Sequence, residues 1–280
     1  MAGVSGLVLA GAALLGLAIG SFMNVVIHRL PRMLERRWAE EEAHQAGRPL
    51  VPGPAFNLAQ PRSACPHCGH TLALWENLPV LSWLLLRGRC SACKGRISPR
   101  YPLIELATGA VFGYAAWRWG LTPTAAAWAG FGATLLALAA IDWDTTLLPD
   151  DLTLPLLWAG LVAAALGWSG TGLAEAVWGA VAGYLSLWCV HQAFLRLTGK
   201  EGMGYGDFKL SAALGAWLGW QALIPVILLA SITGAGVGIT MKFTGGLREG
   251  GYVPFGPFLA LGGLAAMAGG GAAFWRALGL

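Results

Sequence analysis

The feature that most limits the fold of this chain is an uncharged apolar run from Gly3 to Ile27. A helix needs about 20 predominantly apolar residues to cross a bilayer, and this run is long enough. A cleavable signal peptide begins with basic residues, whereas no Lys or Arg precedes Arg29. We therefore expect a retained membrane anchor whose N-terminus lies on the outer side.

More apolar runs follow, at about 102–120, 123–141, 152–168, 172–197 and 253–276. The stretch 210–241 is too long for one ordinary span, and Gly215, Gly219 and Pro225 are candidates for dividing it in two. Only 11% of the chain is charged, against about 25% in soluble domains. The sequence thus predicts an all-α polytopic membrane protein with about eight transmembrane helices.

Residues 29–101 form the one sizeable polar segment, with eleven of the eighteen basic residues and five acids. A basic excess beside apolar spans is typical of the cytoplasmic side of a membrane protein. Nucleic-acid binding is the other interpretation of a basic patch, but a patch between two spans favours the membrane. Alternating from an outer N-terminus then puts 29–101, 142–151 and 198–209 on the cytoplasmic side.

Four of the five cysteines form two C-x-x-C pairs within this segment, Cys65 with Cys68 and Cys90 with Cys93. Four thiolates suit tetrahedral zinc and leave no open position, so the predicted ion is structural. Two disulfides are the alternative, which a reducing cytoplasmic location disfavours. We expect a small zinc-binding cytoplasmic domain inserted after the first helix.

Two aspartates stand at the ends of apolar runs, where acidic side chains are costly and usually functional. Asp142 closes one run, and Asp207 follows a Gly-x-Gly sequence formed by Gly204 and Gly206. The predicted topology puts both at the same membrane face. Two close carboxyls that share a proton can activate water and polarise a scissile carbonyl, as in aspartic proteases. Solvated loop acids are the alternative interpretation, and a lone Gly-x-Gly-Asp is a weak signal.

The motifs together resemble the bacterial type IV prepilin peptidases over nearly the whole chain. The match follows the family's order through 20–31 (GSFMNVVIHRLP), the paired cysteines, 76–83 (ENLPVLSW), 97–106 (ISPRYPLIEL), 142–151, 204–207 and 254–258 (PFGPF). Each piece alone is modest, but the ordered set is highly specific. The resemblance implies catalytic roles for Asp142 and Asp207, with Asp144 as second choice for the first role.

The resemblance also implies the reaction and its place. The substrates are prepilins and type II secretion pseudopilins, whose leader is cut after a glycine on the cytoplasmic side of the bacterial inner membrane. Members with a long cysteine-bearing N-terminal region, which this chain has, also methylate the new N-terminal residue with S-adenosylmethionine. No Rossmann-type glycine motif is present, so the sequence does not place the methyl donor.

Two further charged residues are candidates for supporting roles. Glu105 lies just inside the second span, where it either lines a substrate or donor cavity or pairs with Arg100. Lys209, two residues past Asp207, either favours an ionised carboxylate or lies at the membrane interface with its stem in lipid.

The expected organisation has three parts: a first transmembrane helix over 1–28, a zinc-binding and methyltransferase-associated domain over 29–101, and a membrane peptidase domain over 102–280. An ion or proton transporter is the main rival, because it would use the same acids as a relay. It predicts acids near the midplane of broken helices, whereas these acids cluster at one face. A non-enzymatic scaffold for pilus assembly is the third interpretation. Oligomeric state is left open.

Overall fold

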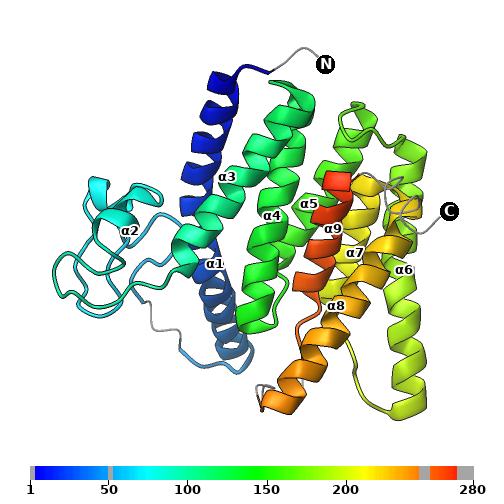
Figure 1. The fold of residues 1–280 in the computed structure, drawn as a ribbon. Helices are drawn as coiled ribbons and strands as arrows, with labels where there is room; N and C mark the ends of the chain where they lie inside the picture. The colour runs from blue at the N-terminus through cyan, green and yellow to red at the C-terminus, as the bar shows by residue number, and fades with distance from the viewer. Residues whose placement is uncertain (1–3, 50–52, 246–252, 270–280) are drawn as a thin grey trace. The chain divides into compact units, whose positions relative to one another are not determined.

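The computed structural model describes residues 4–49, 53–245 and 253–269. In this part of the chain, helices joined by loops make up the regular secondary structure, together with two isolated β-bridges (Figure 1). It forms two compact units, Met1–Leu121 and Thr122–Leu280, which are described separately below. The division does not test the three predicted domain boundaries, which stay predictions.

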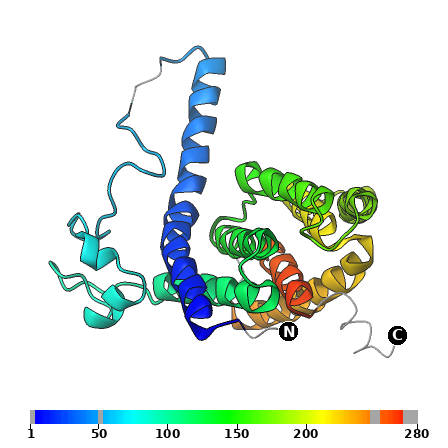
Figure 2. The same ribbon diagram turned by 90° about the horizontal axis from the view of Figure 1, so that it is seen from above.

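The first unit is built on two helices that pack side by side, α1 (Gly6–Gln45) and α3 (Arg100–Trp119) (Figure 2). Glycines allow their close approach. A Cβ on Gly16 would lie 2.7 Å from Phe112 Cβ, and one on Gly20 would lie 2.7 Å from Glu105 Cα. With 40 residues, α1 is about 60 Å long and continues well beyond its apolar run.

The polar segment between these helices contains two short turns of helix, η1 (Leu74–Asn77) and α2 (Leu81–Leu85). Each C-x-x-C pair lies in a tight loop closed by one β-bridge, Ala64 with Thr71 and Arg89 with Arg96. Backbone bonds complete the loops, because Cys65 N–H donates to His70 and Cys90 N–H donates to Gly95. This local pairing orders the chain around the two cysteine pairs.

The second unit is a helical bundle centred on α7 (Tyr205–Leu218). Its other helices are α4 (Pro123–Thr145), α5 (Asp150–Ala165), α6 (Leu173–Thr198), η2 (Trp220–Ala222), α8 (Leu223–Thr244) and α9 (Gly256–Gly269). Helices α5, α6 and α9 all pack against α7 (Figure 1). Its core side chains are large and almost fully buried: Phe131, Leu135, Phe208, Leu210, Leu214 and Trp217. A helix buried on every side is apolar all round, which explains the continuous apolar sequence of α7.

The predicted division of 210–241 occurs at Gly219, whose φ of +80° ends α7 before η2 and α8 begin. Gly215 does not break the chain. It lies inside α7, where its backbone meets Gly179 of α6 in direct contact, and Gly183 meets Ser211 in the same way. Pro225 is accommodated in the first turn of α8, where a missing N–H costs little.

Four helical segments within the described ranges are long and apolar enough to cross a membrane: Gly6–Gln45, Pro123–Thr145, Leu173–Thr198 and Trp220–Thr244. The apolar helices α5, α7 and α9 are shorter, with 16, 14 and 14 residues. The structure therefore supports an all-helical protein with several membrane spans, and eight remains a prediction. Gly3 and the predicted apolar residues 270–276 lie outside the described residues.

Candidate active site and metal centre

Asp142 lies buried near the C-terminal end of α4, although it is a charged residue type. The main-chain N–H of Gly256, at the start of α9, donates a hydrogen bond of 2.9 Å to Asp142 Oδ2. An N–H aimed at a carboxylate oxygen stabilises its negative charge. The fold therefore provides one specific donor for this buried carboxyl group.

Asp207 lies in the first turn of α7 and is also buried. Its backbone N–H bonds to the carbonyl of Gly204, the residue that caps the helix. Among the described residues, Asp207 Oδ1 has no hydrogen-bond partner. The carboxyl group is close enough to Asp142 for the charge of one to act on the other. The structure thus brings the two predicted aspartates into one buried site within the second unit.

Leu148 connects the two halves of this site, because it touches the glycine next to each aspartate. A Cβ on Gly206 would lie 2.7 Å from Leu148 Cβ, and one on Gly256 would lie 3.1 Å from Leu148 Cδ1. The Cβ on Gly256 would also come within 2.6 Å of Asp142 Oδ2. Two positions of the site therefore have no room for a side chain. This explains sterically why the second position of Gly-x-Gly-Asp is a glycine.

Lys209 forms an ion pair with Asp150, and its Nζ lies 2.7 Å from both carboxylate oxygens. Neither alternative that the sequence left open for Lys209 names this partner. Asp150 is the first residue of α5, whereas Lys209 is in the first turns of α7. The pair ties the start of α5 to the helix that carries Asp207, next to the segment that contains Leu148.

The other candidates fall outside this buried site. Asp144 is exposed, whereas Asp142 two residues earlier is buried beside Gly256. Glu105 belongs to the first unit, where it is buried between α1 and α3 and accepts a hydrogen bond of 2.7 Å from Val80 N–H. The hydroxyl of Ser21 also bonds to it. Gly204 is exposed, and a Cβ there would make only ordinary contacts.

The four predicted metal-binding cysteines converge in the first unit. Their Sγ atoms all lie within 4.8 Å of one another, with Cys65 and Cys93 3.9 Å apart and Cys68 and Cys90 4.0 Å apart. Four Zn–S bonds of about 2.3 Å in a tetrahedron place the sulfurs about 3.8 Å apart. All four are free thiols, so the structure shows the cluster without disulfides. The cluster fits a tetrahedral metal ion.

Backbone groups around the cluster favour thiolates unequally. The N–H groups of Cys93 and Ala92 lower the pKa of the Cys90 thiol to about 6. The bond from His70 N–H lowers the pKa of Cys68, but partial desolvation and the three neighbouring thiols together raise it to about 11. A bound cation would stabilise all four thiolates together.

Glu76 supports the cluster, a role that the sequence reasoning did not assign. Its buried carboxyl group accepts a 2.7 Å bond from Ala73 N–H, lies 3.1 Å from His70 Nε2, and bonds to the hydroxyl of Ser91. His70 follows the first cysteine pair and Ser91 lies inside the second, so Glu76 joins the two loops. Its sequence signal is the place of Glu76 at the start of the 76–83 motif, and Gly256 likewise lies within the 254–258 motif.

Comparison with known proteins agrees with this geometry. Residues 14–119 match the model of the bacterial peptidase A24 N-terminal domain, and residues 129–239 match that of the type IV leader peptidase family. No solved structure matches the chain.

Curated relatives named prepilin leader peptidase/N-methyltransferase match over most of both chains. The protein from Burkholderia pseudomallei strain 1026b is 54% identical, covering 94% of this chain and 86% of its own. Those from Stutzerimonas stutzeri and Pseudomonas aeruginosa are each 52% identical over 91% of this chain, and 89% and 88% of their own lengths. With such identity over more than nine-tenths of its length, the chain belongs to the type IV leader peptidase family.

Proposed function

We propose that this protein removes the leader from prepilins and pseudopilins by aspartic catalysis with Asp142 and Asp207. The observation that carries the proposal is the burial of both carboxyl groups in one site, although 64 residues separate them in the chain. Buried carboxyls that interact cannot both ionise easily, so the pair holds a proton between them.

The hydrogen bonds suggest which aspartate has which role. Asp142 receives the Gly256 N–H, which favours its charged form, so Asp142 acts as the base toward water. Asp207 has an unpartnered buried oxygen, which suits a carboxylic acid that donates its proton to the scissile carbonyl oxygen.

The reaction then balances in two steps. Water attacks the carbonyl carbon while its proton goes to Asp142 and the proton of Asp207 goes to the carbonyl oxygen. The resulting diol collapses, the C–N bond breaks, and Asp142 gives its proton to the leaving amine. Asp207 takes back a proton from a diol hydroxyl, which restores the starting state.

The leader is followed in its substrates by an apolar stretch, which makes a membrane-embedded site suitable for this cleavage. We place the catalytic face at the cytoplasmic side of the inner membrane. Basic residues of the 29–101 segment support this orientation.

The relatives' names support a second activity, N-methylation of the new N-terminal residue. S-adenosylmethionine is the donor implied by the family resemblance. Cys65, Cys68, Cys90 and Cys93 would hold a structural zinc ion that fixes the two loops of the first unit. Because four sulfurs fill the coordination of zinc, the ion takes no part in hydrolysis.

A cleavage assay tests the proposal. The full chain in lipid nanodiscs is incubated with a prepilin, and leader loss and methyl gain are followed by mass. Asp142→Asn and Asp207→Asn should each abolish leader loss, whereas Asp144→Asn should retain it. Full cleavage by either buried-site variant excludes that residue from the pair. Proton flux into vesicles without cleavage by the unaltered protein would support the transporter instead.

A further inference from the structure

The segment predicted to be polar carries a large apolar patch, made of Leu74, Trp75, Leu78, Leu81, Leu84 and Leu85. These side chains belong to η1, α2 and the turn between them, and all are exposed, Leu74 by 86% and Leu85 by 74%. Soluble proteins rarely expose this many large apolar side chains within one short segment unless these bind something. The apolar patch therefore needs an occupant.

A hydrogen bond between Val80 and Glu105 holds the apolar patch alongside the apolar parts of α1 and α3. Val80, immediately before α2, donates its N–H to Glu105 of α3, and Glu105 packs on Gly20 of α1. Gly20 lies nine residues before Arg29, which is about 14 Å along α1. Glu105 lies five residues, or about 7.5 Å, past Arg100. Along both α1 and α3, helix α2 thus starts level with the apolar part of the helix, beyond the arginine that marks its polar end.

The backbone of Val80 is strained, which indicates that the surrounding structure fixes the position of α2. Val80 has φ of +60° and ψ of −47°, a region that β-branched residues avoid. This conformation of Val80 sets the direction in which α2 runs away from Glu105. In that direction, the side chains of Leu81, Leu84 and Leu85 are exposed. Strained residues persist only where their surroundings hold them, and here Glu105 provides the hold.

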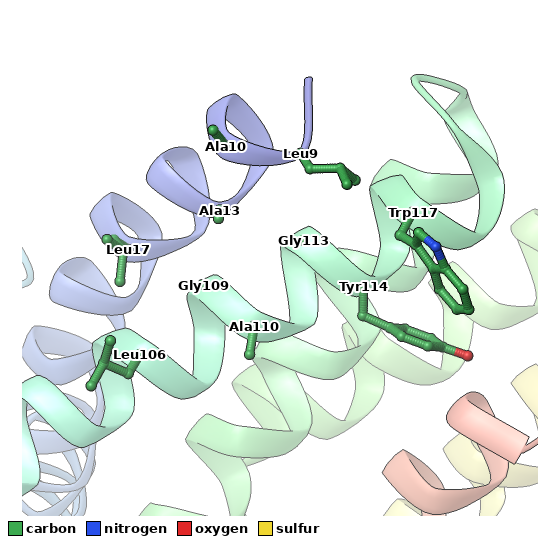
Figure 3. Close-up of a pocket in the computed structure, with 10 residues that line it drawn as sticks. All are labelled: Leu9, Ala10, Ala13, Leu17, Leu106, Gly109, Ala110, Gly113, Tyr114 and Trp117. Carbon is green, nitrogen blue, oxygen red and sulfur yellow. The ribbon is translucent and has the colours of Figure 1, made fainter. Parts of the chain in front are cut away.

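The two helices of the first unit also expose apolar surface of their own. A groove of about 560 Å³ between α1 and α3 is lined by apolar and small residues, among them Leu9, Leu17, Leu106 and Trp117 (Figure 3). Leu103 and Leu106, on either side of Glu105, are exposed by 61% and 49%. The first unit therefore exposes large apolar side chains on α1 and α3 as well as in the apolar patch, as expected for a unit that contacts lipid.

Charges around the apolar patch identify the kind of surface. Arg87, Arg89, Lys94 and Arg96 follow it and are exposed, whereas the one acid in this stretch, Glu76, is buried. Apolar side chains beside basic residues are typical of segments that lie in the interface of membranes with anionic lipids.

We propose that the apolar patch inserts into the bilayer leaflet next to Arg29 and Arg100, with the four basic residues at anionic headgroups. The cysteine cluster is then held at the membrane surface by a lipid anchor of its own, in addition to α1 and α3. The proposal does not depend on the catalytic pair, since it concerns only the first unit.

Depth-dependent quenching tests it in the full chain. A fluorescent amino acid is placed at Leu84, and the protein in nanodiscs containing phosphatidylglycerol is exposed to spin-labelled lipid and to aqueous iodide. Matched probes replace Leu14, an exposed residue in the apolar run of α1, and Glu41, an exposed residue in its charged extension. Monodisperse elution confirms that each variant is folded.

We expect the Leu84 probe to behave as the Leu14 probe does, with strong quenching by lipid and several-fold weaker quenching by iodide than at Glu41. Iodide quenching equal to that at Glu41 would overturn the proposal, because the patch would then face water. Protection from both quenchers would also overturn it, because protein would then cover the patch.

A second measurement tests the charge component. Arg87→Gln together with Arg89→Gln should reduce lipid quenching at Leu84 in nanodiscs with phosphatidylglycerol, and should have no effect in neutral ones. Equal lipid quenching at Leu84 with and without the two arginine substitutions, in both kinds of nanodisc, would overturn the role of anionic headgroups. Because neither readout uses cleavage, failure of this proposal is distinguishable from failure of the catalytic one.

Discussion

Gly256 N–H donates to Asp142 Oδ2 across 2.9 Å, so a residue at the start of α9 holds a carboxyl group at the end of α4. The contact joins residues 114 positions apart. It leaves no room for a side chain on Gly256, whose Cβ would lie 2.6 Å from the same oxygen. The orientation of Asp142 therefore depends on the packing of α9 against α4.

Gly256→Ala should lower kcat/KM for leader cleavage by roughly 10- to 100-fold, because the new methyl group must displace the Asp142 carboxylate and small displacements of catalytic groups are costly. Steady-state cleavage of a prepilin measures the effect. Gly130→Ala is the matched control, since Gly130 lies on α4 with nothing within 4 Å of an added Cβ. It should stay within about twofold of the unaltered protein. Equal activity of both variants would contradict the role given to Gly256.

The two glycines before Asp207 should respond differently to the same change. Gly206→Ala puts a methyl group 2.7 Å from Leu148 Cβ, so it should separate the two halves of the site and lower kcat/KM at least tenfold. Gly204→Ala meets nothing closer than 3.9 Å and keeps an ordinary φ of −82°, so activity should remain within about threefold. Parallel cleavage assays decide, and the opposite ranking would contradict the steric account.

The sequence predicted those features that depend on a local pattern of residues. Uncharged runs indicated the helices, C-x-x-C spacing indicated the cysteine cluster, and a positive-φ glycine was among the expected breaks in 210–241. The order of acids and apolar runs also indicated that Asp142 and Asp207 share a membrane face. Their placement in one buried site agrees with that prediction.

What the sequence did not predict depends on contacts between distant residues. No local signal shows that Gly256 meets Asp142, or that Lys209 chooses Asp150. Periodicity also cannot tell a lipid-facing helix from one surrounded by protein, so the sequence did not show that neighbouring helices bury most of α7. The sequence also carried no local signal that the apolar residues of 74–85 stay exposed, because apolar side chains of a folded segment are more often buried.

The ion pair between Lys209 and Asp150 should contribute modestly to stability. Both side chains are partly exposed, by 30% and 54%, so solvent screens the pair and a coupling energy of about 0.2–1 kcal/mol is expected. Thermal unfolding of Lys209→Met, Asp150→Asn and the double variant gives this energy by a double-mutant cycle. Lys200→Met with Glu201→Gln, at exposed neighbouring positions, is the control cycle and should show less coupling. A coupling energy of zero in the first cycle would mean that the contact contributes nothing to stability.

Removal of the metal should disorganise the cysteine-bearing segment and spare the second unit, because the four thiols belong entirely to the first unit. Elemental analysis should find one zinc ion per chain. Cys65→Ser should lose it, whereas Cys189→Ser should keep it, since Cys189 is an exposed residue of α6 outside the cluster. Chelation should open residues 57–97 to proteolysis, because zinc-dependent folds lose structure without their ion. Zinc retained by Cys65→Ser at full occupancy, or unchanged proteolysis after complete chelation, would contradict a four-cysteine structural site.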